Sequence, residues 1–279
     1  MRTHIMFQDT QIMKRLVQAF ATTLVCLWGT NSYAVPLPVI VLQDAFTGDG
    51  ALVGRTPDTV NLPGGTWQRQ GNPGWTTDRS GGQARLGADA GVGVSIASAG
   101  SYTKPTVMRL EGDIDYTTAT DDAFPLRNIG LGFFPSPLSG GVVLAGHNFT
   151  GINLDKAGNV NLLQVSNDGN PAYPTAITLG NFGGAFTTGL HHMSYDVDTT
   201  TGNISNLIID STPISTPTVS IFTDAATAFV GMYGSSASGA TLNLFDNVTL
   251  STVPEPSAMV LAGIAVLGLG LLNRTRRKT

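Results

Sequence analysis

The sequence predicts an all-β protein: a two-sheet antiparallel jelly-roll sandwich with an apolar helix at each end of the chain. Short segments in which apolar and polar residues alternate recur through the chain, and turns rich in Gly, Asn and Asp separate them. Between residues 35 and 252 no amphipathic helix of useful length is predicted, and no repeat of fixed period argues for a propeller or a β-helix.

The clearest predicted strand is 106–116, because its side chains alternate with a period of two. One face carries Met108, Leu110, Ile114 and Tyr116, and the other carries Arg109, Glu111, Asp113 and Asp115. Further strands are predicted at 129–134, 142–147, 160–165, 191–198, 204–210, 228–233 and 241–250, with turns at 155–159, 167–170 and 199–203.

The first 34 residues predict a cleaved signal peptide. Lys14 and Arg15 precede the apolar stretch 16–28, and Ser32-Tyr33-Ala34 fits a small-x-small cleavage site. We therefore expect a signal helix and a signal peptidase that cuts after Ala34. The alternative is an uncleaved anchor, and the true initiator is open between the first methionine, Met6 and Met13.

The C-terminal segment 253–279 combines three parts in a fixed order. Pro254-Glu255-Pro256 is followed by the apolar run 258–272 and then by four cations, Arg274, Arg276, Arg277 and Lys278. As a helix, the apolar run would span about 22 Å at ~1.5 Å per residue, against a hydrocarbon core of ~30 Å. It predicts a marginal transmembrane segment with its basic end in the cytoplasm and the body outside. An ordinary single-pass anchor is the alternative.

These three parts resemble the PEP-CTERM sorting signal of Gram-negative bacteria. The resemblance implies that an exosortase recognises and cleaves the tail. It also implies an inner-membrane intermediate, a destination at the cell surface or in the extracellular matrix, and an association with biofilm and exopolysaccharide producers. It covers only the tail and leaves the ligand of the body open.

The body, 35–252, has eight Lys and Arg residues against seventeen Asp and Glu, a net charge of −9. Such a charge disfavours nucleic acid as a partner. The single cysteine, Cys26, lies in the predicted signal peptide, so the mature chain has no disulfide and depends on its hydrophobic core.

Several pieces of the body resemble concanavalin A-like, laminin-G-like domains. The segments 44–50, 54–58 and 65–67 are similar to their opening, 192–198 with 204–210 to a late hairpin, and 245–250 to their closing strand. The resemblance implies one jelly-roll domain over 35–252. Such domains include carbohydrate binders, glycoside hydrolases and structural modules, so the fold alone does not choose a function.

Glu111, Asp113 and Asp115 are the best catalytic candidates, because paired carboxylates on one strand face suit glycoside hydrolysis. They distantly resemble the Glu-x-Asp-x-Glu strand of jelly-roll glucanases, with Asp115 where the second glutamate would be. A solvated strand face with Arg109 as an ion-pair partner is the simpler interpretation. Adjacent strand residues point to opposite faces, so His191 and His192 do not form a joint metal site.

No cofactor and no metal site is assigned. Sixteen of the seventeen acidic residues in the body are Asp, and the pairs at 121–122, 167–168 and 196/198 offer oxygen ligands for one structural calcium ion. Trp75, in a glycine-rich loop, is the candidate for stacking on a sugar ring, whereas Trp67 is expected in the core.

The sequence therefore favours an exported, exosortase-sorted protein of the cell surface or matrix. We expect it to be non-catalytic, not an enzyme, and associated with glycan or exopolysaccharide. The alternative is a glucanase-like hydrolase that uses Glu111 and Asp113.

Overall fold

The structure is a computed structural model of the chain. It describes residues 38–61, 65–70, 76–87, 92–97, 106–115, 129–134, 149–154, 158–164, 175–181, 189–220, 222, 229–234 and 243–253. Outside these residues lie Ala34, Trp75, Pro254, Glu255, Pro256, the two predicted terminal helices, the predicted strand 142–147 and the predicted turn 167–170.

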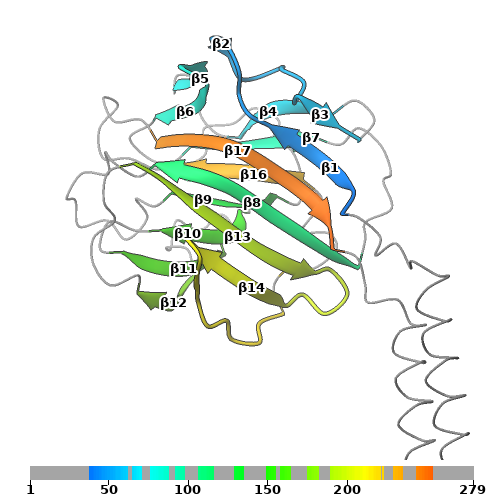
Figure 1. Cartoon of the computed structure of the whole chain (residues 1–279), viewed down its shortest axis with the longest axis vertical. Coiled ribbons are helices and arrows are strands. Elements are labelled where there is room, and N and C mark those ends of the chain that lie inside the picture. Colours follow the sequence, from blue (N-terminus) through cyan, green and yellow to red (C-terminus); the bar gives the residue numbers. More distant parts are fainter. Residues whose placement is uncertain are drawn as a thin grey trace, which may run out of the picture. The chain divides into compact units, whose positions relative to one another are not determined.

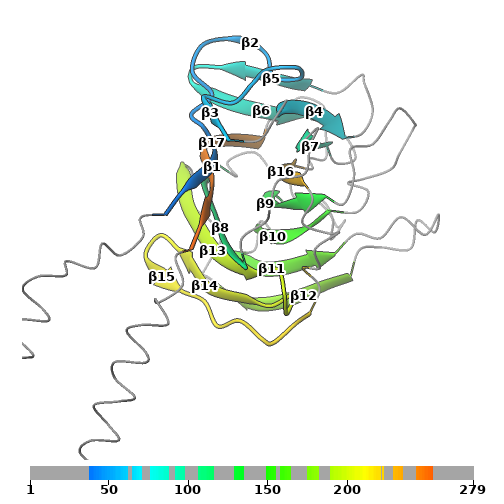
Figure 2. The same ribbon diagram turned by 90° about the vertical axis from the view of Figure 1, so that its right-hand side faces the viewer.

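Residues 38–255 form one compact unit, in which two antiparallel sheets pack face to face (Figures 1 and 2). Every regular element among the described residues is a β-strand. The predicted all-β, two-sheet antiparallel jelly-roll sandwich is confirmed. Within the described part of the chain, no helix is long and apolar enough to cross a membrane.

Sheet A, in front in Figure 1, has the C-terminal strand near its centre. Its order is β15 (Thr212–Pro213), β14 (Ile204–Ile209), β13 (Leu190–Asp198), β8 (Val107–Asp115), β17 (Asn243–Thr252), β6 (Gln83–Gly87), β5 (Thr76–Ser80) and β2 (Gly50–Ala51). β1 (Ile40–Asp44) pairs with both β17 and β3 (Thr59–Val60). The first and last strands of the sandwich therefore lie side by side.

Sheet B lies behind sheet A in Figure 1. Its order is β12 (Thr175–Asn181), β11 (Asn159–Gln164), β10 (Thr150–Leu154), β9 (Ile129–Phe134), β16 (Phe229–Gly234), β7 (Val92–Ala97) and β4 (Thr66–Gln70). The chain passes repeatedly from one sheet to the other, for example between β6 and β7, β8 and β9, and β16 and β17, so neighbours in a sheet are often distant in sequence.

The core between the sheets follows from the alternation that predicts the strands. On β8 the side chains of Met108, Leu110 and Ile114 have no exposed surface and pack in the main apolar cluster. Tyr195 of sheet A joins the two layers, because its hydroxyl donates to the Leu131 carbonyl of sheet B at 2.9 Å. Each fully buried large apolar side chain contributes about 1.5–3 kcal/mol to the free energy of unfolding. The chain has a single cysteine, Cys26, so no disulfide within the chain adds to this burial.

A segment after β15 closes one side of the sandwich (Figure 2). The Ile214 amide donates to the Leu207 carbonyl at 2.8 Å, and the Ile214 side chain reaches Gly180 on β12. Phe222 then enters the core and packs edge-on against Phe133, with ring centroids 6.1 Å apart. The segment thus links the edge of sheet A to the edge of sheet B.

The predicted turn at 199–203 joins β13 to β14. The Asp198 carboxylate accepts hydrogen bonds from the amides of Thr200 at 2.8 Å and Thr201 at 3.0 Å, and Gly202 adopts φ 75°. These amides, Thr201 first, lower the pKa of Asp198. Asp198 is therefore a turn-forming residue of the hairpin.

Candidate functional site

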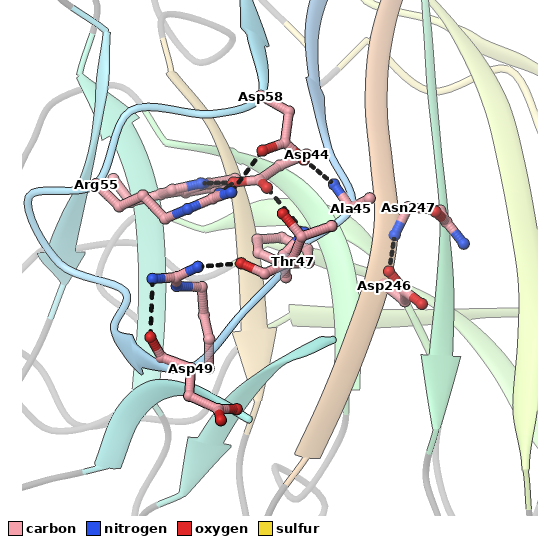
Figure 3. Close-up of polar contacts among 11 residues, drawn as sticks. Asp44, Ala45, Thr47, Asp49, Arg55, Asp58, Asp246 and Asn247 are labelled. Atoms are coloured by element: carbon pink, nitrogen blue, oxygen red, sulfur yellow. Dashed lines mark hydrogen bonds and ion pairs between the residues drawn. The ribbon is translucent and has the colours of Figure 1, made fainter. Parts of the chain in front are cut away.

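A buried carboxylate, that of Asp44 at the end of β1, accepts hydrogen bonds from several residues of the first segment of the body (Figure 3). Asp44 has no exposed surface. Its Oδ2 accepts from Trp67 Nε1 at 2.6 Å and from the Arg55 guanidinium, and its Oδ1 accepts from the Phe46 amide at 2.8 Å. Burial raises the pKa of Asp44, and these three donors oppose that effect.

Asp58 completes this network from the other side of Arg55 (Figure 3). Its Oδ1 lies 2.5 Å from Arg55 Nη2, and its Oδ2 accepts from the Ala45 amide at 3.0 Å. Burial works to raise the pKa of Asp58, but the Ala45 amide and Arg55 together lower it. The three sequence pieces of the predicted opening therefore meet at one carboxylate, whose contacts are structural.

A second cation holds the loop that follows. The Arg79 guanidinium donates to the carbonyl of Thr47 and, at 3.3 Å, to that of Asp49. The Asp49 carboxylate in turn accepts from the Gly81 amide at 3.0 Å. These contacts fix the loop in which Phe46 adopts φ 48°, a left-handed conformation that is strained for a bulky side chain.

The catalytic candidates lie on the outer face of sheet A, away from the core. Arg109, expected to pair with the carboxylates of its own strand, instead forms a bidentate ion pair with Asp196 of β13, at 2.7 and 3.0 Å. Both oxygens of Asp113 are engaged: His192 Nδ1 lies 2.7 Å from Oδ1, and Asn247 Nδ2 donates to Oδ2 at 2.8 Å. Asp113 is thus held in a surface network rather than presented to a substrate.

The carboxylate nearest to Asp113 across the strands is Asp246, which the sequence does not single out. The two residues are paired in register on β8 and β17. Burial raises the pKa of Asp246, and the charges of Asp113 and Asp44 add to that effect. Residues so far apart in sequence become neighbours only through the sheet register, which no local pattern reveals.

Those histidine and calcium candidates that the structure describes do not assemble into a metal site. His191 is buried, with Nδ1 2.5 Å from Asp210 Oδ2, whereas His192 is exposed on the opposite face. Asp196 is occupied by Arg109 and by Asn206 Nδ2 at 2.7 Å. Among the described residues, no group of three or more His, Cys, Asp or Glu side chains is placed to hold a metal ion. The calcium candidates at 121–122 and 167–168, and the third histidine of the body, His147, lie outside these residues.

The outer face of sheet B has a different chemistry. Strands β9, β10, β11, β12 and β16 contain no charged residue. A row of polar side chains crosses three of them, because the register places Asn153 opposite Asn161 and Asn161 opposite Thr178. We call Asn153, Asn161 and Thr178 the amide row. Thr178 Oγ1 donates to Asn161 Oδ1 at 2.9 Å.

An aromatic cluster lies beside the amide row on the same face. Phe134, Phe149, Leu163 and Tyr233 are buried together, separately from the main core. The Phe149 ring stacks on Tyr233 with centroids 5.1 Å apart. A Cβ at Gly132 or Gly151 would lie 2.7 or 2.5 Å from Phe149 Cζ, so the two glycines make room for this ring.

Comparison with known proteins supports the tail assignment. Residues 252–277 match the PEP-CTERM protein-sorting motif. The resemblance inferred from the tail is confirmed, and it indicates exosortase-sorted export through a membrane intermediate, of the Gram-negative type. A comparison with curated proteins found no match.

Solved structures with similar folds are distant in sequence. An endo-1,3-β-glucanase from Streptomyces sioyaensis is 16% identical over 80% of this chain and 100% of its own, with a TM-score of 0.45. The Emp46p carbohydrate recognition domain is 11% identical over 66% and 87%, with a TM-score of 0.46. Domain 4 of the arabinanase AbnA from Geobacillus stearothermophilus, in complex with arabinotriose, is 12% identical over 78% and 95%, with a TM-score of 0.45. At such identities and scores, these structures carry no argument about ligand or activity.

Proposed function

We propose that the protein is a non-catalytic component of the cell surface or extracellular matrix whose β-sandwich associates with glycan, such as the exopolysaccharide of its host. The observation that carries the glycan association is the outer face of sheet B. There, the exposed Thr178 hydroxyl donates to the Asn161 amide, on strands without charge. Neutral hydrogen-bonding groups match the hydroxyls of sugars.

The terminal segments supply the route in this proposal. Signal peptidase removes residues 1–34, leaving a body at 35–252 and a sorting segment at 253–279. The apolar run 258–272 holds the chain in the membrane with its basic end in the cytoplasm. Exosortase then acts at Pro254-Glu255-Pro256. Trp75 stays a proposed stacking residue on the body.

The surroundings of the carboxylates on sheet A support the non-catalytic assignment. A general acid must reach the leaving oxygen with a free carboxyl group, within hydrogen-bond distance of it. Asp113 instead accepts hydrogen bonds at both oxygens from groups of its own sheet. Arg109 and Asp196 form an ion pair in the adjoining row of the same face.

The hydrolase alternative, using Glu111 and Asp113, retains one favourable observation. Asp246, paired in register with Asp113, has a raised pKa, as a general acid requires. The Asn247 amide, which donates to Asp246 Oδ1 at 2.7 Å, opposes this rise of the pKa. A hydrolase on this face would use Glu111 and Asp113, with Asp246 opposite Asp113.

The test combines retention and cleavage. The full-length protein is run through native gels that contain exopolysaccharide purified from the host, and reducing ends are measured in parallel. We expect retarded migration without reducing ends, for wild type, Glu111→Gln and Asp246→Asn alike. Reducing ends from wild type that either substitution abolishes would establish the hydrolase. Unretarded wild type would leave no support for glycan association.

A further inference from the structure

One buried side chain on the outer face of sheet B has no hydrogen-bond partner. Asn153 lies on β10 between Ile152 and Leu154, which both pack in the main core, so its side chain is on the outer face. It has no exposed surface, and neither its Oδ1 nor its Nδ2 is hydrogen-bonded within the described structure. An unsatisfied buried polar group costs about 1–3 kcal/mol. Such a cost is unusual in a native core without a compensating role.

The fold makes room for this amide. Gly130 on β9 is paired with Asn153, and a Cβ at Gly130 would lie 2.5 Å from the Asn153 Cβ and 2.5 Å from the Ile152 carbonyl oxygen. Any other residue at Gly130 would displace Asn153. On the far side of Gly130, the register places Tyr233 of β16. Asn153 therefore lies beside the aromatic cluster, in a position that requires glycine at residue 130.

The amide row connects Asn153 to the surface. Asn161 is 5% exposed, and Thr178 on the edge strand β12 is exposed. Polar groups thus run from a fully buried amide to the sheet edge. Thr178 is therefore the end of the row that a ligand meets first, since Asn161 and Asn153 are 5% and 0% exposed.

We propose that Asn153 is the deep anchor of a subsite for one neutral sugar unit, with the rest of the amide row lining its approach; this rests on the proposed glycan association. A primary amide offers two donors and one acceptor oxygen, and adjacent hydroxyls of a sugar can accept from Nδ2 and donate to Oδ1. The five neighbouring strands contain no charge to balance an anionic unit, and an unpaired buried charge costs far more than an amide. The subsite therefore selects neutral over acidic glycan.

The test replaces Asn153 by Leu, which has similar volume and no polar atom. The full-length protein is run in native gels that contain a neutral β-1,3-glucan, mannan or arabinan, with alginate as the anionic probe. We expect at least one neutral polysaccharide to retard the wild type and alginate not to. We expect Asn153→Leu to weaken that retention at least tenfold and to melt at the same or a higher temperature, because it removes an unsatisfied amide.

Two controls and one second variant make the outcome decisive. Thr178→Val, at the exposed end of the row, should weaken retention partly, and Glu111→Gln on sheet A should leave it unchanged. If Asn153→Leu does not fold, Asn153→Ser keeps one hydroxyl and should fold with reduced retention.

Each contrary result separates the subsite from the wider function. Unchanged retention in a folded Asn153 variant overturns the subsite and leaves glycan association standing. A lower melting temperature with unchanged retention shows that the amide satisfies a structural contact such as a buried water. Retention by alginate alone overturns the neutral-sugar selectivity. No retention of the wild type by any of these polysaccharides overturns the subsite, whereas the gels with host exopolysaccharide decide the glycan association.

Discussion

Asp44→Asn is the sharpest test of how the opening of the body is held. The substitution keeps the size and removes the charge. Trp67 Nε1 and Arg55 both donate to Oδ2, whereas the Phe46 amide donates to Oδ1. An asparagine therefore points its NH₂ group either at the two side-chain donors or at the backbone donor. In both orientations a donor faces a donor.

The expected loss follows from burial. Asp44 is fully buried and the Arg55 side chain is 15% exposed, so the substitution breaks a buried ion pair and leaves the guanidinium without its inner carboxylate. Breaking such a pair costs about 3–5 kcal/mol. For a domain of 150–250 residues, each kcal/mol lowers the melting temperature by about 2–4 °C. We expect a decrease of about 6–20 °C.

The assay is thermal and urea unfolding followed by circular dichroism, with Asp58→Asn as the matched control. Asp58 binds the same guanidinium but is 37% exposed, and an exposed pair contributes only about 0–1 kcal/mol. A loss below about 1 kcal/mol for Asp44→Asn, or equal losses for the two variants, would refute the reasoning.

Four further outcomes are expected. Gly132→Ala should lower the free energy of unfolding in urea by about 1–3 kcal/mol, because its Cβ would lie 2.6 Å from a backbone Cα. Gly180→Ala is the control: its Cβ would lie 3.3 Å from a side-chain methyl group, so its stability should stay near that of wild type. The pKa of Asp198 is lowered in the folded state, so its carboxylate stabilises the fold above the unfolded-state pKa of about 4. This contribution is lost as pH falls through the folded-state pKa. Asp198→Asn should therefore lose less stability than wild type between pH 7 and pH 3. Mass spectrometry of the exported protein should show an N-terminus directly after Ala34, and an intact leader would contradict cleavage. Replacing 254–256 by three alanines should leave export intact and strand the chain unprocessed in the membrane; unchanged maturation would favour a plain anchor.

The sequence predicts strands well where one face is buried. On β8 the buried and partly exposed side chains alternate as expected, and the hairpin of β13 and β14 has its predicted turn. It assigns no strand to the first part of the body, where β1 to β7 lie, nor to the short β15. It also misses β10 and β12, whose sequences Thr-Gly-Ile-Asn-Leu and Thr-Ala-Ile-Thr-Leu-Gly-Asn mix glycine and polar residues with few apolar ones. In β10 every residue is buried, so the alternation that marks a half-buried strand is absent.

Contacts across the sheets are harder to predict than the strands themselves. Along the sequence, Arg109 is close to Glu111. It nevertheless pairs with Asp196, because the register of β8 and β13 places Arg109 opposite Asp196. The sequence alone does not distinguish Asn153 from the other asparagines, because its pairing with Gly130 depends on the register of β10 and β9. Candidate sites that depend on such pairings therefore require the topology, whereas the sorting tail is contiguous and can be read from the sequence.

The two outer faces of the sandwich divide the charge of the body unequally. Sheet A carries Arg109, Asp113, Asp196 and Asp246, and most of their polar atoms already have partners within the sheet. The outer face of sheet B around β9–β12 has no charge, and it holds a buried amide, Asn153, whose hydrogen bonds are unmade. Charged groups that already have partners on the protein leave few free hydrogen-bonding atoms for a ligand. The Asn153 amide, in contrast, would gain hydrogen bonds from a ligand. For a chain with a strongly acidic body, this difference favours a neutral polyhydroxylated partner on sheet B over an ionic partner on sheet A.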